Sequence, residues 1–204
     1  MSIVVYGQPA SRTFRVLWML EESGAPYEIV PHAFGGPETK SAAFLAINPN
    51  GAIPAITDDG RSLFESLAIN LYLSRKSGAL WPRDVAGEGI AFQWTLWAAT
   101  ELEGPIGQWG YHTFLLPEAE RRPELAAEAA GKVERRLTIL EGALACTPWL
   151  AGEAFGIADL NVAAVLFRGP RFGLERWPRV ADWHQRCYAR PAAQRAVALR
   201  EVKS

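Results

Sequence analysis

The first part of the chain alternates between short apolar runs and helical patterns. Residues 3–6 and 27–30 are β-branched and aromatic runs that predict buried strands. Between them, apolar positions at helical spacing predict a helix over residues 12–23, with Ser11 at the N-cap position and Gly24 as its left-handed stop. A strand, a helix and a second strand therefore open the chain.

The next segment predicts a short helix, a hairpin and a longer helix. The turn signal Asp58-Asp59-Gly60 separates two short runs that predict strands, which is typical of a hairpin. The predicted elements are a helix over 41–47, strands over 55–57 and 62–64, and a helix over 65–77. The order βαβαββα is thus complete by residue 78.

Strand signals nearly vanish beyond Gly87, and long helical patterns replace them. These predict helices over 88–109, 123–145, 157–167 and 179–190. Residues 79–87 carry proline and glycine and are typical of a linker. We therefore expect an α+β domain over 1–78, a linker over 79–87 and an all-helical bundle domain over 88–204.

Composition confines the chain to the folded globular class. Hydrophobic residues make up 49% and charged residues 21%, with a net charge of −1. This balance gives no electrostatic footprint for nucleic acid or an anionic membrane. The N-terminus lacks the pattern of a signal peptide, and the apolar runs are shorter than the ~20 residues of a membrane span. A cytoplasmic location is expected.

Charge is distributed unevenly within the helical half. Residues 84–167 hold twelve acidic and five basic side chains, whereas residues 168–203 hold three acidic and nine basic ones. The basic segment fits either an anion-binding surface or a solvated helix face that complements its acidic neighbour. The single spacing of the basic residues favours the second interpretation.

The sequence lacks the cysteine and histidine patterns that thiol redox chemistry and metal binding require. The two cysteines, Cys146 and Cys187, form neither a C-x-x-C pair nor a cluster with histidine. A redox dithiol, a structural zinc site and a disulfide framework are therefore not expected, and no metal is assigned.

Three short segments carry candidate chemistry. Ser11 stands between a strand end and a helix start, where a hydroxyl either caps the helix or helps to bind an anion. Pro54 begins a predicted strand, and a cis bond there would free the backbone of Ile53 for an extended peptide. Glu65 and Ser66 open the third helix and suit the ammonium and carboxylate of an α-amino acid, although ordinary capping also explains them.

Together these segments resemble one family. The motifs are YGQPAS over 6–11, RTFRVLWMLEE over 12–22, NPNGAIP over 48–54, FESLAINLY over 64–72 and FGIADLN over 155–161. In this order and spacing they are similar to cytosolic glutathione S-transferases, and the serine at the strand end resembles the serine-type bacterial, theta and phi groups. The resemblance implies a thioredoxin-like domain, then a helical bundle, and a homodimer.

The resemblance also implies a glutathione site. Ile53 would pair through its backbone with the cysteinyl part of glutathione, ahead of a cis Pro54. Glu65 and Ser66 would hold the γ-glutamyl amine and carboxylate, and Lys40 the glycyl carboxylate. Ser11 would hydrogen-bond the sulfur as the catalytic residue.

Two positions depart from the family pattern. Ala52 replaces a polar or basic residue that reaches the tripeptide in many relatives, which weakens the expected contact at the glycyl end. Gly156 replaces the serine or threonine that usually forms a capping box with Asp159. Glycine is an acceptable N-cap, so we expect the fold to tolerate it.

The implied activity is that of a detoxification enzyme, a transferase that conjugates the glutathione thiolate to small hydrophobic electrophiles. Glutathione is the co-substrate. A glutathione-dependent isomerase or dehalogenase on the same scaffold, or a non-catalytic interaction module, remains an alternative. Candidate residues for the electrophile site are Pro9, Phe34, Trp109 and Phe114.

Overall fold

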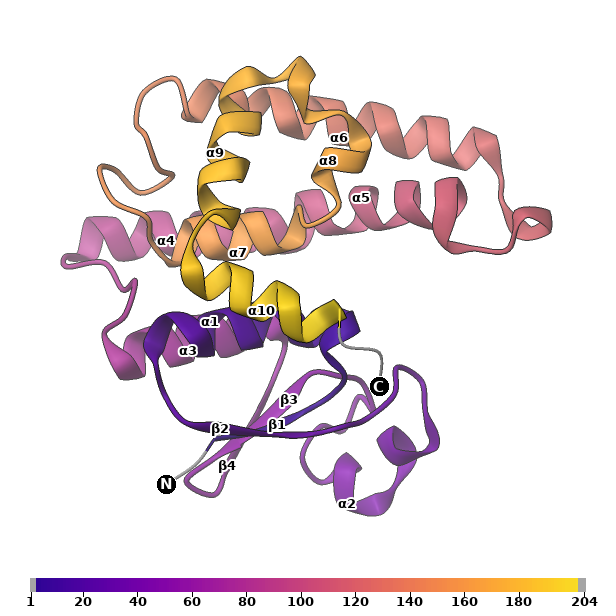
Figure 1. Cartoon of the computed structure of the whole chain (residues 1–204), viewed down its shortest axis with the longest axis vertical. Helices are drawn as coiled ribbons and strands as arrows, with labels where there is room; N and C mark the ends of the chain where they lie inside the picture. Colours follow the sequence, from indigo (N-terminus) through magenta and orange to yellow (C-terminus); the bar gives the residue numbers. More distant parts are fainter. Residues whose placement is uncertain (1–2, 202–204) are drawn as a thin grey trace. The chain divides into compact units, whose positions relative to one another are not determined.

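The computed structural model describes residues 3–201 and divides into two compact units (Figure 1). The first unit combines the chain up to Trp81 with the segment from Tyr188 onward. The second unit is Pro82–Cys187.

A four-stranded mixed sheet forms the base of the first unit. Its strands are β1 (Ile3–Tyr6), β2 (Tyr27–Val30), β3 (Ala55–Asp58) and β4 (Arg61–Phe64), in the order β2-β1-β3-β4. β1 pairs parallel to β2 and antiparallel to β3, and β3 and β4 form an antiparallel hairpin. Asp59 and Gly60 both have positive φ, as a two-residue hairpin loop requires. The predicted strands and hairpin are confirmed.

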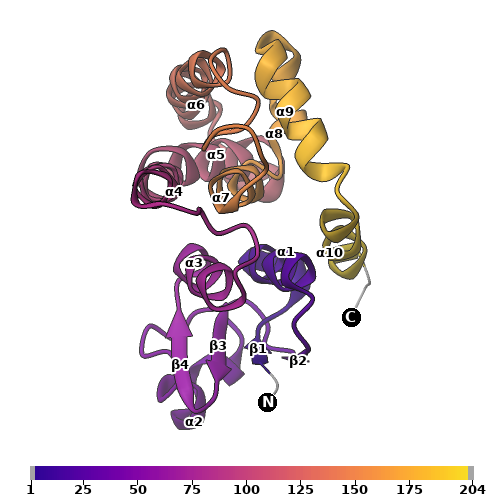
Figure 2. The ribbon, with the colours of Figure 1, turned by 90° about the vertical axis from the view of Figure 1, so that its left-hand side faces the viewer.

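Helices α1 (Phe14–Ser23) and α3 (Ser66–Ser77) cover one face of this sheet, and the short α2 (Ala42–Leu45) lies apart from them (Figure 2). Every residue of α1 from Phe14 to Leu20 is buried. A helix is buried all round only when elements cover it on all sides. The sheet covers one side of α1, and a C-terminal helix covers another.

That C-terminal helix is α10 (Pro191–Glu201), which the hydrophobic pattern did not predict. It packs along α1, and its buried residues are Ala192, Ala193 and Ala196. Just before it, Arg190 forms a bidentate ion pair with Glu22, with both N–O distances 2.7 Å. The element was missed because alanine gives a weak apolar stripe.

The second unit is helical throughout its regular elements. They are α4 (Val85–Trp97), α5 (Glu103–Gly110), α6 (Pro123–Ala143), α7 (Ile157–Val165), α8 (Gly169–Phe172) and α9 (Pro178–Tyr188). The single helix predicted over 88–109 is instead two helices, α4 and α5, joined by a wider helical turn over Ala98–Leu102. Sheet and helical unit together confirm the predicted fold class, and none of the described helices is long and apolar enough to cross a membrane.

Asp159 fixes the start of the buried helix α7. Its carboxylate accepts hydrogen bonds from the backbone N–H groups of Leu150 at 2.9 Å and Gly156 at 3.0 Å, and from Trp183 Nε1 at 2.8 Å. Gly156 has no side chain to return the bond, so only the Asp159 half of the capping box forms. The carboxylate ties the N-terminus of α7 to the preceding loop and to α9.

His184 predicts how the fold responds to acid. Its Nε2–H donates to the Leu166 carbonyl at 3.1 Å, and burial lowers its pKa from 6.5 to about 4. Between these values the unfolded chain binds a proton that the folded chain excludes. The free energy of unfolding should therefore fall by up to about 3 kcal/mol as the pH drops from 6.5 to 4.

Urea unfolding at a series of pH values measures this effect. The variant His184→Gln should lose the additional slope in that window while keeping the slope due to the carboxylates. Parallel pH profiles for the two proteins would contradict the assignment.

Candidate functional site

The register of the sheet brings the three candidate segments to one edge. Tyr6 lies opposite Ala55, and Ala55 lies opposite Phe64. The chain leaves Tyr6 toward Ser11, it enters Ala55 from Ile53 and Pro54, and it leaves Phe64 into Glu65 and Ser66. Segments that are far apart in sequence therefore begin or end side by side.

Ser11 lies in the loop that joins β1 to α1. Its backbone is extended, and its hydroxyl donates to the Gln8 carbonyl at 2.7 Å. The same oxygen accepts the backbone N–H of Thr13 at 3.1 Å and lies 2.9 Å from the Thr13 hydroxyl. The side chain thus caps the start of the helical segment while remaining half-buried.

Two contacts fix this loop. Thr13 is fully buried against Gly7, and a Cβ at Gly7 would clash with the Thr13 hydroxyl. From α10, the guanidinium of Arg200 donates to the carbonyls of Pro9 and Ser11, both at 3.2 Å. The backbone around Ser11 is therefore held from both sides.

Asn48 organises the turn before Ile53. Its side chain is buried and donates to the Ala52 carbonyl at 2.6 Å. Its Oδ1 accepts the backbone and side-chain N–H groups of Asn50 at 3.0 and 3.1 Å. This network sets the direction in which the chain enters Ile53.

The Ile53–Pro54 bond is cis, as the family resemblance implies. The Ile53 side chain packs in a small core with Phe44 and Ala55. Among residues 3–201, no hydrogen bond uses the backbone N–H or carbonyl of Ile53. Both groups are thus available to a ligand.

Glu65 and Ser66 lie at the start of α3. Glu65 is exposed and has φ 68° and ψ 106°, which is uncommon for a residue with a side chain. Such outliers concentrate at binding and catalytic sites. Ser66 is buried, and its hydroxyl accepts a hydrogen bond from the buried Arg15 of α1 at 3.2 Å.

The remaining predicted residues take varied positions. Lys40 is exposed, and its Nζ donates to the Gly51 carbonyl at 3.3 Å, next to the Asn48 turn. Pro9 is part of the Ser11 loop, and Phe34 is 64% exposed on a loop of the first unit. In the second unit, Trp109 packs edge-to-face on Phe114 at 5.5 Å.

Sequence reasoning did not identify Arg15, Asn48 or Arg200 as parts of this site. Arg15 lies within the apolar run of α1, and Arg200 lies in a helix that was not predicted. Asn48 lies in the motif over residues 48–54, from which only Ile53 and Pro54 are predicted to belong to the site. Its position before Pro49 in a turn with glycine is the one signal that could have marked it as an organising residue.

Comparison with known proteins identifies the class of protein. Residues 1–75 match the family described as glutathione S-transferase, N-terminal domain, and residues 105–191 match the glutathione S-transferase, C-terminal domain. The chain belongs to the glutathione S-transferase family.

Individual relatives agree over nearly the full length. The disulfide-bond oxidoreductase YfcG of Escherichia coli (strain K12) is 31% identical over 96% of this chain and 94% of its own. Glutathione S-transferase 3 of Zea mays is 32% identical over 95% and 92%. The theta class glutathione S-transferase from Xanthomonas axonopodis pv. citri, solved with glutathione bound, has a TM-score of 0.89 at 29% identity, covering 96% and 97%.

Asn48 provides a test of how the site is built. The variant Asn48→Ala removes the bond to Ala52 and leaves the Asn50 amide without its acceptor. We expect the free energy of unfolding to fall by about 2 kcal/mol, measured by urea denaturation.

Asn50→Ala is the matched control. Asn50 is exposed, and in the described part of the chain its side chain bonds to Asn48 alone, so its removal should cost less than about 0.5 kcal/mol. Equal losses in both variants would show that Asn48 does not organise the turn.

Proposed function

We propose that this protein is a glutathione transferase that conjugates the glutathione thiolate to small hydrophobic electrophiles. The observation that carries the proposal is the convergence of Ser11, Ile53 and Glu65 at one edge of the sheet. Membership of the family and a neighbour solved with glutathione bound support glutathione as the co-substrate.

The chemistry of each segment suits one part of the tripeptide. The backbone N–H and carbonyl of Ile53 fit the extended cysteinyl residue, as a strand edge would. The exposed Glu65 carboxylate fits the γ-glutamyl ammonium group, and Ser66 with the first amides of α3 fits its carboxylate. Lys40 fits the glycyl carboxylate. Ala52 has no polar side-chain group with which to bind that carboxylate.

Ser11 would activate the sulfur. A free thiol with a pKa of about 8.5 is only about 3% ionised at pH 7. Lowering the pKa by about two units needs about 2.7 kcal/mol of preferential thiolate stabilisation. A hydrogen bond to a charged group supplies about 1.5–3 kcal/mol, and a nearby helix N-terminus about 0.3–1 kcal/mol.

The hydroxyl has one proton, so binding must redirect it. In the structure that proton points to the Gln8 carbonyl. A thiolate is a charged acceptor and would compete with this neutral carbonyl, while the Thr13 amide continues to donate to the Ser11 oxygen. Arg200 is a positioning residue, because its bonds to the Pro9 and Ser11 carbonyls hold the loop.

Electrophile recognition is the variable part of such an enzyme. Pro9 and Phe34 of the first unit and Trp109 and Phe114 of the second are the proposed contacts. Isomerisation or dehalogenation would use the same activated thiolate, and a non-catalytic interaction module would retain glutathione without turning it over. We place the reaction in the cytoplasm, where glutathione is the principal small thiol.

Disulfide reduction is a second candidate, because one full-length relative is named a disulfide-bond oxidoreductase. The exposed Cys146 and the buried Cys187 belong to the second unit, whereas the proposed glutathione contacts belong to the first, so glutathione itself would supply the thiols. A bound thiolate would attack the substrate disulfide, form a mixed disulfide and release one thiolate. A second glutathione would then release the other, giving oxidised glutathione and two substrate thiols.

A homodimer is the proposed assembly. Phe92 and Leu96 are 44% and 63% exposed one turn apart on α4, an apolar pair that a second copy of the chain would cover. Leu96→Asp should shift the protein toward the monomer in analytical ultracentrifugation, because association would bury the new carboxylate. The exposed control Glu118→Gln should leave the mass unchanged, and a wild-type monomer would refute the assembly.

Replacing Ser11 tests thiol activation. The variant Ser11→Ala should raise the pKa in the pH profile of kcat/KM by one to two units and, through the smaller thiolate fraction, lower kcat/KM at pH 7 about 3- to 25-fold. Ser11→Thr keeps a hydroxyl and tolerates the extended backbone, so it should retain most of the activity.

An unchanged profile in Ser11→Ala would assign the role to Thr13 or Arg12 instead, with Tyr6 less suited because it packs against His32 and Phe44. Repeating the assay with aryl halides, epoxides, isomerisable substrates and a low-molecular-weight disulfide distinguishes the candidate reactions. Retention on immobilised glutathione without turnover of any of them would refute the transferase.

A further inference from the structure

Two arginines of the basic C-terminal segment lack the acidic partners that their neighbours have. Ion pairs to carboxylates occupy Arg176, Arg179, Arg186, Arg190 and Arg195. Among residues 3–201, neither Arg168 nor Arg171 forms a salt bridge, and neither guanidinium donates a hydrogen bond. Arg176 and Arg179 pair with carboxylates of the acidic segment 84–167, as the complementary-face interpretation expects, whereas Arg168 and Arg171 do not.

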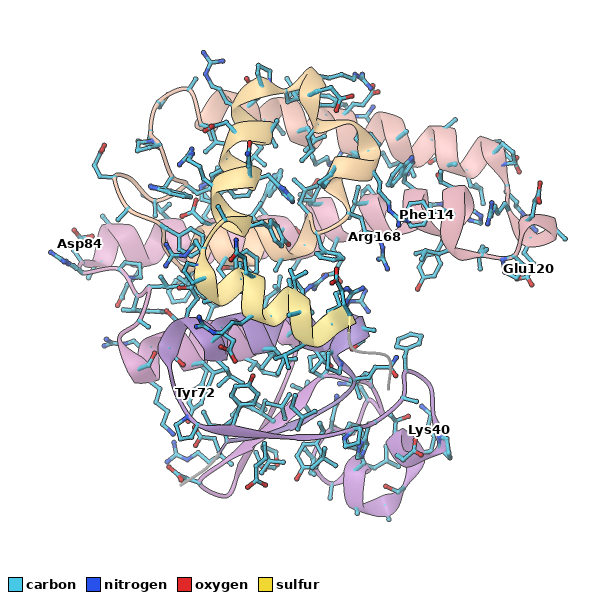
Figure 3. The ribbon with its side chains drawn as sticks, viewed as in Figure 1. Lys40, Tyr72, Asp84, Phe114, Glu120 and Arg168 are labelled. Carbon is cyan, nitrogen blue, oxygen red and sulfur yellow. The ribbon has the colours of Figure 1, made fainter. Side chains whose placement is uncertain are left out.

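Both guanidinium groups lie against one aromatic ring. The Arg171 guanidinium carbon is 4.8 Å and that of Arg168 is 6.0 Å from the ring centroid of Phe114. Figure 3 shows the side chains of Arg168 and Phe114 beside each other near the end of α5. Trp109 packs edge-to-face on Phe114 at 5.5 Å and on Phe172 at 5.0 Å.

The backbone beneath this cluster is fixed. Phe114 lies in the helical turn Tyr111–Leu115 that continues α5. Arg121 donates from Nε to the Leu116 carbonyl at 2.8 Å and from a terminal nitrogen to the Phe114 carbonyl at 3.4 Å. Arg121 therefore holds the backbone of Phe114 in place, so the position of the Phe114 ring is fixed before a ligand binds.

Such a pair of cations is electrostatically costly without an anion. Arg168 is half-buried, and burial followed by the charge of Arg171 lowers its pKa, while Tyr111 opposes this. Two other arginine–aromatic contacts of the same unit show the ordinary arrangement. Arg176 lies over Trp177 with Glu134 as its partner, and Arg186 lies over Trp149 with Asp182.

We propose that Arg168 and Arg171, with Phe114 and Trp109, form a binding site for an aromatic carboxylate. Guanidinium groups match a carboxylate through paired N–H donors, and the aromatic side chains match an apolar ring. This inference rests on the proposed function in one respect, because Trp109 and Phe114 are candidate contacts of the electrophile. If the site is part of the electrophile site, the enzyme accepts negatively charged electrophiles as well as neutral ones.

Equilibrium binding tests the site without any reaction. Calorimetric titration compares nitrobenzoate with its uncharged analogue nitrobenzamide. The wild type should bind the carboxylate about tenfold more tightly, a moderate value for a charge-assisted contact that is partly open to solvent. Added salt should reduce this preference, because the charges are partly exposed.

Variants assign the preference to the two arginines. Arg168→Gln with Arg171→Gln should abolish it while leaving nitrobenzamide binding within about twofold. Arg171→Gln alone changes an exposed residue and tests the site even if the Arg168 substitution impairs folding. Arg168→Lys should retain part of the preference, and Arg176→Gln, the arginine over Trp177, should retain all of it.

Equal affinities for the two probes in the wild type, or a preference that survives the loss of both arginines, would overturn the proposal. Comparing the rates at which glutathione is conjugated to chlorodinitrobenzoate and to chlorodinitrobenzene tests the binding site and the proposed transferase activity separately. A carboxylate preference in binding with no conjugation of either compound would support the site and contradict transfer to aryl halides. Conjugation of both without a preference that depends on these arginines would refute the site and support the transferase.

Discussion

The close approach of Gly7 to the fully buried Thr13 is the constraint on which the candidate site depends. With no Cβ at Gly7, the chain leaves β1 and turns directly over the Thr13 side chain. Thr13 in turn donates its amide to the Ser11 hydroxyl. The same contact brings Gly7 against Ile53, because a Cβ at Gly7 would lie 3.3 Å from the Ile53 Cβ. The close approach at Gly7 therefore fixes the position of the loop that carries Ser11 relative to Ile53.

Elements remote in sequence maintain this arrangement. The helix α10 packs on α1 and delivers Arg200 to the carbonyls of Pro9 and Ser11. Before the neighbouring strand β3, Asn48 sets the turn that leads into Ile53. Between α1 and α3, Arg15 donates to Ser66. Binding groups on loops are thus positioned by buried or multiply bonded side chains, which limits the reorganisation that a ligand requires.

Much of the fold could be predicted because local signals agree with the final structure. The β-branched runs of β1 and β2 and the Asp-Gly turn between β3 and β4 specify strands and a hairpin without tertiary information. By contrast, α10 carries its buried face on alanines, and the wider turn between α4 and α5 continues the helical spacing. The helix α10 and this wider turn both depend on tertiary packing, which cannot be predicted from the spacing of apolar residues.

The candidate site was predictable only where a motif marked it. Ser11 and Glu65 stand between a strand and a helix and Pro54 stands before a strand, so their positions at the ends of elements already mark them as candidates. The unusual φ of Glu65, the burial of Arg15 and, within residues 3–201, the absence of acidic partners at Arg168 and Arg171 arise from the three-dimensional arrangement. Charge counting identified a basic segment, but only the structure separates its paired arginines from its unpaired ones.

The central claim is that the folded chain stabilises the thiolate of glutathione. The most direct measurement is a titration of the thiol of glutathione bound to the wild-type protein, followed by the ultraviolet absorption of the thiolate. The bound thiol should have a pKa about two units below the value of about 8.5 for a free thiol. A bound thiol that titrates at its free value would contradict it.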